Sequence, residues 1–374
     1  MKKLLEIYVH IPFCIRKCAY CDFLSMASTR EQQKQYQKAL EREILAAGEL
    51  PDYEVSTVFF GGGTPSVPDA EDLMRTMELL KRRFCFSEGA EITLEANPGT
   101  LTRRKLELYR QAGFNRISLG CQSVHNGELK LLGRIHSFEE FLESWQMTRE
   151  AGFTNINVDL MSGLPGQTQE SWEKSLTTIA QLNPEHISAY SLIVEPGTPF
   201  ASRKLDLPDE ETERKMYECT GEILGSFGYT QYEISNYAKP GLACRHNIGY
   251  WKRTEYLGFG PGAASLLDNC RFTNTTDVTQ YLRDSGCPEQ IRENQEQLSE
   301  KDCMEEFMFL GLRMNEGISE AEFEAQFRRT PDEIYGNVLE KYLTSGFLWR
   351  KNGRIGLTRE GISVSNVVMS EFLL

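Results

Sequence analysis

The strongest constraint on the fold is an alternation of short β-like runs with amphipathic helical segments over residues 1–235. The β-like runs fall at 6–13, 57–60, 91–96, 116–121, 155–160 and 186–194. Apolar residues recur at helical spacing at 29–47, 70–83, 102–112, 138–151, 169–182 and 209–227. A helix between two strands returns the chain to the same end of the sheet, so the strands pair in parallel. Six successive units therefore predict a parallel sheet covered by helices.

Three of the expected strands carry polar residues on one face. Along the strands these positions are Thr93, Glu95 and Asn97, then Ser118, Gly120 and Gln122, then Asn155, Asn157 and Asp159. A parallel sheet with helices on both faces is apolar on both. A polar face must instead look into a cavity that holds a polar ligand. We therefore predict an α/β fold built as a partial (β/α)6 barrel, like a TIM barrel but open.

The pattern changes beyond the sixth unit. Residues 236–295 are rich in Gly, Asn and aromatic side chains without sustained periodicity, which predicts an irregular connecting segment. Residues 296–374 predict three helices, a hairpin with an Asn352-Gly353 turn and a closing helix. This order is typical of a helical, winged-helix-like domain. The chain is thus expected to contain a barrel, a connecting segment and a carboxy-terminal domain.

The overall charge limits the classes of partner. The formal net charge is −13, whereas proteins that grip nucleic-acid backbones usually present a basic surface, so no nucleic-acid partner is expected. No apolar run reaches the roughly 20 residues that span a bilayer. The apolar residues near the amino terminus lead directly into a cysteine motif, which a cleaved signal peptide would remove. We expect a cytoplasmic protein without an integral membrane segment.

Three of the ten cysteines form a motif directly after the first expected strand, at Cys14, Cys18 and Cys21. Three thiolates at this spacing can hold three irons of a [4Fe–4S] cluster and leave the fourth iron open. An open iron can accept the amino and carboxylate groups of S-adenosylmethionine (SAM). The alternative is zinc, for which Cys244 and His246 could complete the ligands. Structural zinc sites usually use two paired sets of ligands, and no second CxxC is present, so the cluster is favoured.

Polar groups expected on the same rim can contact SAM. The segment Gly61-Gly62-Gly63-Thr64-Pro65 ends the second strand, and glycines allow backbone N–H groups to approach a carboxylate. Other candidates near the strand ends are Glu95, Gln122 and Asp159, which can bond ribose hydroxyls or an ammonium group, and Arg134, which can pair with a carboxylate. Each alone is more often a structural polar group, but their convergence favours ligand contact.

Four further stretches accompany the cysteine triplet: YVHIPFC at 8–14, GGGTP at 61–65, LEANP at 94–98 and GLPGQT at 163–168. With them the chain resembles the radical SAM family of oxygen-independent coproporphyrinogen III dehydrogenases and, most closely, the HemW-type haem chaperones. The resemblance implies that the three cysteines hold the cluster and that SAM coordinates its fourth iron. It implies SAM contacts from Tyr8, Gly62, Gly63, Thr64 and Glu95. Gln122, Arg134 and Asp159 correspond to contacts with a second SAM in the dehydrogenases.

Two local features separate the branches of this family. The dehydrogenase pattern has a further cysteine two residues after the triplet, where this chain has Phe23. The chaperone pattern has an HNxxYW signature, present here from His246 to Trp251. This branch implies haem contact, with His246 as a candidate axial ligand and Tyr250 and Trp251 packed against the macrocycle. The alternative for His246 is a buried histidine that bonds to the backbone.

Three functions remain open from the sequence. The first, which both branch features favour, is a haem chaperone without dehydrogenase activity that delivers haem to an acceptor protein. The acceptor could bring the protein into peripheral contact with a membrane. The second is radical oxidative decarboxylation of coproporphyrinogen III to protoporphyrinogen IX. The third is radical SAM chemistry on an unrelated substrate.

Overall fold

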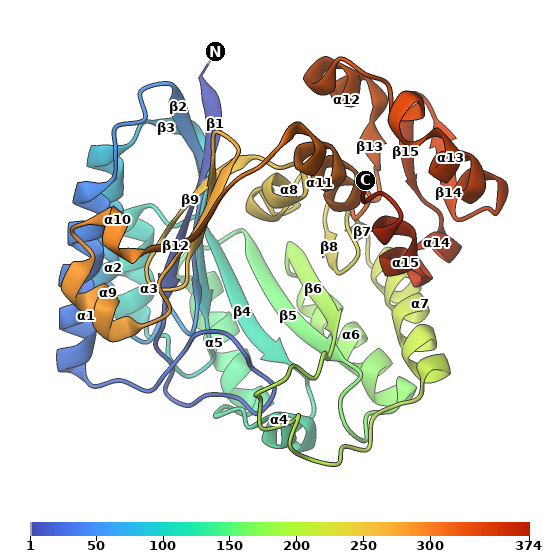
Figure 1. Cartoon of the computed structure of the whole chain (residues 1–374). Coiled ribbons are helices and arrows are strands. Elements are labelled where there is room, and N and C mark those ends of the chain that lie inside the picture. Colours follow the sequence, from blue (N-terminus) through green and yellow to red (C-terminus); the bar gives the residue numbers. More distant parts are fainter. Residues whose placement is uncertain (1) are drawn as a thin grey trace.

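The predicted alternation is present in a computed structural model, which describes residues 2–374. The strands β1 (Lys3–Ile11), β2 (Tyr53–Gly62), β3 (Phe86–Ala96), β4 (Arg116–Gln122), β5 (Ile156–Ser162) and β6 (His186–Ser191) pair in parallel in this order. The helices α1 (Arg30–Ala46), α2 (Ala70–Arg83), α3 (Arg103–Ala112), α5 (Phe138–Glu150), α6 (Gln169–Leu182) and α7 (Glu210–Ser226) connect or follow them (Figure 1). The predicted partial barrel is confirmed. A short helix that the periodicity did not predict, α4 (Asn126–Leu132), follows β4.

Local sequence signals explain where these helices begin and end. The hydroxyls of Thr29, Ser137 and Thr168 accept backbone N–H groups at the starts of α1, α5 and α6, each within a capping box. At the end of α3, Gly113 takes a left-handed conformation with φ of 99°. The caps define helix boundaries, while the apolar faces of the helices pack onto the sheet.

The segment 236–295, which we predicted to be irregular, contains regular structure. The strand β9 (Glu255–Phe259) pairs in parallel with β1, and β10 (Ala264–Leu267), β11 (Cys270–Asn274) and β12 (Arg292–Gln297) extend that edge in antiparallel fashion. At the other edge lie β8 (Asn236–Ala238) and β7 (Thr230–Gln231). The prediction was wrong because these strands are short, and β12 is polar and exposed along its whole length, so no apolar periodicity marks them.

The same segment contains helix α8 (Arg245–Trp251), which holds the HNxxYW signature. Figure 1 shows α8 near the end of the barrel at which β4, β5 and β6 begin. Gly249 of α8 packs so closely on Glu6 of β1 that a Cβ there would lie 1.9 Å from the Glu6 carboxylate. Helix α8 therefore closes the amino-terminal end of the barrel, opposite the cysteine loop.

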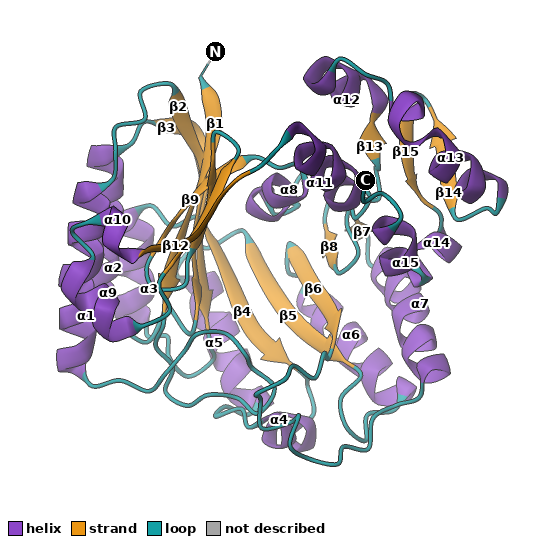
Figure 2. Ribbon diagram, viewed as in Figure 1, coloured by secondary structure: helices purple, strands orange, loops and turns teal. Residues whose placement is uncertain are grey.

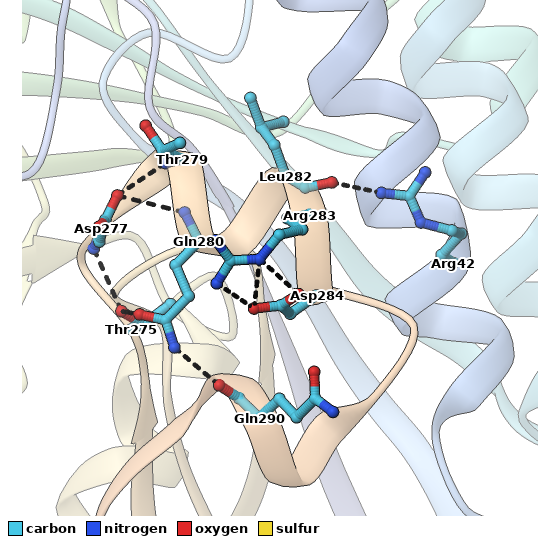
Figure 3. Close-up of polar contacts among 9 residues, drawn as sticks. All are labelled: Arg42, Thr275, Asp277, Thr279, Gln280, Leu282, Arg283, Asp284 and Gln290. Carbon is cyan, nitrogen blue, oxygen red and sulfur yellow. Dashed lines mark hydrogen bonds and ion pairs between the residues drawn. The ribbon is translucent and has the colours of Figure 1, made fainter.

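Helices α9 (Val278–Asp284) and α10 (Pro288–Ile291) pack beside α1 and hold this added edge (Figure 3). The Asp277 carboxylate accepts the backbone N–H groups of Thr279 and Gln280 and so caps α9. Arg42 of α1 donates to the Leu282 carbonyl. The contact between Arg42 and Leu282 joins residues 240 positions apart.

A buried carboxyl group, Glu43, lies at the centre of this junction. It accepts hydrogen bonds from the Gly260 N–H at 2.8 Å, the Asn274 side-chain amide at 2.6 Å and the Tyr281 hydroxyl at 2.5 Å. Burial raises the pKa of Glu43 to about 7, although these three donors oppose the shift. The folded protein therefore binds this proton more tightly than the unfolded chain.

Proton binding at Glu43 predicts how the free energy of unfolding changes with pH. The pKa of Glu43 in the folded state is above the ordinary 4.5. Proton binding at Glu43 therefore stabilises the fold fully below pH 4.5, and this stabilisation is lost as the pH rises to about 7. The shift corresponds to about 3 kcal/mol of unfolding free energy. We expect the wild type to lose about this much more stability over that interval than Glu43→Gln, in urea unfolding at a series of pH values. Parallel curves for the two proteins would contradict the prediction.

The carboxy-terminal elements form a separate hydrophobic core around a three-stranded sheet (Figure 2). They are α11 (Glu300–Gly311), β13 (Ile318–Ser319), α12 (Glu320–Phe327), α13 (Pro331–Thr344), β14 (Leu348–Lys351), β15 (Arg354–Leu357), α14 (Arg359–Ser363) and α15 (Ser365–Ser370). The predicted hairpin is confirmed, with positive φ at Asn352 and Gly353. The predicted closing helix is broken into two at Val364, whose φ is −123°. Within the part of the chain described, no helix is long and apolar enough to cross a membrane.

Candidate functional site

The polar faces predicted for the third, fourth and fifth strands meet inside the barrel. Glu95 lies in register with Ser118, which lies in register with Asn157, and Gly120 lies in register with Asp159. Their side chains point to one lumen because neighbouring parallel strands present paired residues on the same face. The lumen opens, at the carboxyl ends of the strands, into a cavity of about 430 Å³. Barrel proteins generally place their sites at this end.

The cavity brings together most of the predicted site residues. Those lining it are Cys14, Cys18, Cys21, Gly62, Gly63, Thr64, Glu95, Gln122, Arg134 and Asp159. Tyr8 lies just behind this wall, since a Cβ on Gly61 would stand 3.1 Å from its ring. Residues from the loop after β1 and from the ends of four strands therefore converge on one space, as the sequence predicted.

The cysteine loop is fastened at both ends by backbone hydrogen bonds. The Cys14 N–H donates to the Met26 carbonyl at 2.9 Å, and the Ala19 N–H donates to the Leu132 carbonyl at 2.9 Å. The Cys14 thiol lies 3.5 Å from the Thr64 hydroxyl. These contacts hold the three thiols at the cavity while leaving each partly exposed.

The glycine turn requires glycine for two reasons. Gly62 has φ of +106°, and a Cβ on it would lie 2.5 Å from the His10 ring. A Cβ on Gly63 would lie 2.7 Å from the Phe13 carbonyl oxygen. The Gly62 N–H donates to the Glu95 carboxylate at 3.2 Å. The turn thus runs between β1, the cysteine loop and β3.

Two carboxyl groups share the buried floor of the cavity. Burial, followed by the nearby Asp159 charge, raises the pKa of Glu95 to about 8. Burial also raises the pKa of Asp159, which accepts hydrogen bonds from Ser118 at 3.2 Å and Asn157 at 2.7 Å. Two carboxyl groups with raised pKa values favour a cationic ligand, because a cation stabilises their charged forms.

Arg134 provides a positive charge in the lining of the cavity. Its guanidinium donates to the carbonyl of Gly120 at 2.6 Å and to the Asn97 side chain, and it lies 3.7 Å from the Cys18 sulfur. Its Nε atom is buried and has no partner within residues 2–374. The side chain of Gln122, where φ is +70°, accepts the Tyr190 hydroxyl at 3.3 Å. The cavity therefore presents groups suited to both charges of an amino-acid moiety.

Comparisons with known proteins agree with this geometry. Residues 8–179 match the family described as the Radical SAM superfamily, and residues 298–364 match the HemN C-terminal domain. The chain is 37% identical over 375 residues to "Heme chaperone HemW" of Bacillus subtilis, covering 98% of each chain. The chain belongs to the HemW family of radical SAM proteins. The Escherichia coli protein of the same name is 35% identical, with 99% of this chain and 98% of that protein covered.

A solved structure supports the fold of this HemW-family chain. The chain superimposes on the coproporphyrinogen III oxidase HemN of Escherichia coli, a radical SAM enzyme, with a TM-score of 0.87. The alignment covers 100% of this chain and 90% of that one at 27% identity. The barrel and the carboxy-terminal domain therefore occur together in both proteins.

Membership of the radical SAM family implies a [4Fe–4S] cluster and SAM, and the cavity fits both. Three thiols lie beside an open space, and the same space is lined by Arg134 and by the buried carboxyl of Glu95, which suit the two ends of a zwitterion. Among the described residues, no three His, Cys, Asp or Glu side chains converge as ligands of one metal ion. In a cubane each thiolate binds a different iron, so the cluster cysteines need not converge on one point.

The HNxxYW residues lie away from this cavity. His246 is only 2% exposed, and its Nδ1 and Nε2 atoms contact the hydroxyls of Thr57 at 2.7 Å and Tyr250 at 3.2 Å. Burial lowers the pKa of His246 to about 3. The guanidinium of Arg313 lies 4.4 Å from the Trp251 ring. In this arrangement neither ring nitrogen of His246 is free for an iron, so the alternative of a buried, hydrogen-bonded histidine describes it, with hydroxyls rather than backbone groups as partners.

Several cavity residues were missed as site residues by the sequence reasoning. They include Tyr20, Asn97, Ser118 and Tyr190. The alternation within strands was sufficient to find Asn97 and Ser118, which we placed on the polar face without assigning a role. It also places Tyr190 on the inward face of β6 with His186 and Ser188. No periodic signal marks Tyr20, because it lies in the irregular cysteine loop.

Proposed function

We propose that this protein binds haem and passes it to an acceptor protein, while a SAM-coordinated [4Fe–4S] cluster occupies the barrel mouth. The observation that carries the proposal is identity of 37% over 98% of both chains with a protein named "Heme chaperone HemW". Relatives of the same name in Lactococcus lactis and Escherichia coli are similar along nearly their whole length. A match to the barrel alone would support only the radical SAM family.

In this proposal Cys14, Cys18 and Cys21 hold the cluster, and SAM occupies the adjoining cavity. The Thr64 hydroxyl provides a donor for the carboxylate of SAM, the glycine turn lets SAM lie close against the backbone, and Glu95 accepts a hydrogen bond from the amino group of SAM. When bound, the cluster supplies a site for one-electron chemistry next to SAM. The chain's own residues hold the ligands in place and leave the thiols accessible from the rim.

The rim offers a surface of the right chemistry for haem. Phe23 lines the cavity and is 63% exposed, and Ile15 on the same loop is 56% exposed. Arg16 and Lys17 lie between them and also line the cavity. An apolar macrocycle with two propionates suits exposed apolar side chains beside cations.

Coproporphyrinogen III dehydrogenation is the second candidate. It is supported by the similarity to HemN and by the presence of Gln122, Arg134 and Asp159 in the cavity. Phe23 in place of the dehydrogenase cysteine favours the chaperone. Both candidates use the cluster and SAM, and they differ in whether the porphyrin is converted or only carried.

Haem titration after anaerobic cluster reconstitution tests both functions. We expect saturable, stoichiometric haem binding and no conversion of coproporphyrinogen III. Phe23→Asp should weaken haem binding by about tenfold or more, since burial of a phenylalanine contributes about 1.5–3 kcal/mol. The matched control is Val367→Asp, because Val367 is 60% exposed on α15, away from the rim. Formation of protoporphyrinogen by the wild type would contradict the chaperone and establish the second candidate.

A further inference from the structure

A stack of aromatic rings connects the HNxxYW helix to the SAM cavity through the barrel lumen. The His246 ring stacks on Phe59 with centroids 5.1 Å apart and an interplanar angle of 21°. Phe59 in turn stacks on Tyr8 with centroids 6.4 Å apart and an angle of 22°. The three rings come from α8, β2 and β1. Since aromatic rings pack in defined geometries, each ring restricts the orientation of the next.

At the α8 end of this stack, polar contacts hold His246 in place. Thr57 and Tyr250 engage its two ring nitrogens, and its backbone N–H donates to the Glu91 carboxylate at 3.2 Å. Tyr250 also packs edge-on against the imidazole with centroids 4.8 Å apart. His246 is therefore held on all sides at the closed end of the barrel.

At the other end of the stack, Tyr8 contacts His10, which reaches both the cysteine loop and the glycine turn. The Tyr8 hydroxyl lies 3.1 Å from Nδ1 of His10, and Nε2 of His10 lies 2.8 Å from the Leu24 carbonyl. A carbonyl only accepts, so Nε2 carries the proton and Nδ1 accepts from Tyr8. Leu24 belongs to the cysteine loop, and the His10 ring lies directly against Gly62 of the glycine turn.

We infer that His246 is a positioning residue for the cluster and SAM site, acting through Phe59, Tyr8 and His10. The stack holds Tyr8, the Leu24 carbonyl fixes the tautomer of His10, the Tyr8 hydroxyl fixes the orientation of its ring, and His10 supports the cysteine loop and the glycine turn. The inference rests on the proposed use of that cavity for the cluster and SAM. It assigns the signature histidine to the interior of the barrel rather than to haem.

The test uses the full-length protein with its cluster reconstituted anaerobically, and compares His246→Ala, His246→Phe and Phe59→Leu with the wild type. SAM affinity, the SAM-induced change in the electron paramagnetic resonance spectrum of the reduced cluster, and haem stoichiometry are measured for each. We expect His246→Ala and Phe59→Leu to weaken SAM binding by about tenfold to a hundredfold, the usual effect of losing a supporting residue. Both should reduce the spectral change and retain wild-type haem stoichiometry.

His246→Phe keeps a ring on Phe59, so it should restore much of the SAM affinity lost in His246→Ala. The matched control is His125→Ala, because His125 contacts the Ser171 carbonyl and lies outside the stack. Unchanged SAM affinity and spectra in Phe59→Leu, or loss of haem alone in His246→Ala, would overturn the inference. If the wild type binds SAM but no haem, the chaperone proposal fails while the SAM measurements still decide the role of His246.

Discussion

Cys14→Ala is expected to abolish the broad absorption near roughly 400 nm that thiolate-held iron–sulfur clusters show after anaerobic reconstitution. Cys14 is one of three thiols on the cavity wall, and no other cysteine lines that cavity within the described chain. A cubane held by two thiolates would expose two irons and be held less firmly by the loop. The measurement is the visible spectrum together with bound iron and sulfide per chain.

The matched control for this prediction is Cys85→Ala. Cys85 is exposed between α2 and β3, outside the cavity, so its removal should leave the spectrum and the iron content at wild-type values. A cluster spectrum that survives in Cys14→Ala would show that the assignment of the ligands is wrong. A loss in both variants would indicate general damage to the fold rather than loss of a ligand.

Glu95→Gln is expected to weaken SAM binding by about tenfold to a hundredfold at pH 9, since a hydrogen bond to a charged group contributes about 1.5–3 kcal/mol. The effect depends on pH because the Glu95 pKa is about 8 in the absence of ligand. The N–H groups of the SAM amino group donate to the carboxylate form of Glu95, so at lower pH a proton must leave Glu95 first. Wild-type affinity should therefore rise about tenfold per pH unit up to about pH 8 and then level off.

Calorimetric titration of SAM between pH 6 and 9 measures this slope. In Glu95→Gln the slope due to the carboxyl is absent, and any slope that remains is due to SAM itself. Glu88→Gln makes the same change on an exposed position of β3, and should reproduce the wild-type curve. An identical pH dependence in Glu95→Gln and the wild type would show that Glu95 does not bond to the amino group of SAM.

The barrel and its cavity could be predicted because their signals are local and periodic. The alternation of Thr93, Glu95 and Asn97 with apolar neighbours places them inside the lumen, whereas the register of β3 with β4 is known only from the structure. The strands after α8 could not be predicted in this way. Their stability depends on pairing with β1, which lies far away in the sequence, and on the junction at Glu43.

The position of His246 in the fold could also not be predicted from local sequence patterns. A signature at one point of the chain does not show which way its helix faces, and α8 is only seven residues long. Whether His246 meets haem or Thr57 depends on a contact between residues 189 positions apart. The cysteines were easier to assign because spacing within a single loop determines which thiols can meet at one cavity.

The closed end of the barrel has a consequence for the order of events at the open end. With α8 packed over Glu6, and with Glu6 and His246 both 2% exposed, ligands cannot reach the cavity through the α8 end of the barrel. The barrel is thus closed at the α8 end and open at the mouth. In the proposed function, haem bound at Phe23 would cover the SAM in the cavity, so SAM would bind before haem and leave after it. Exchange of SAM would have to wait until the cargo has been handed over.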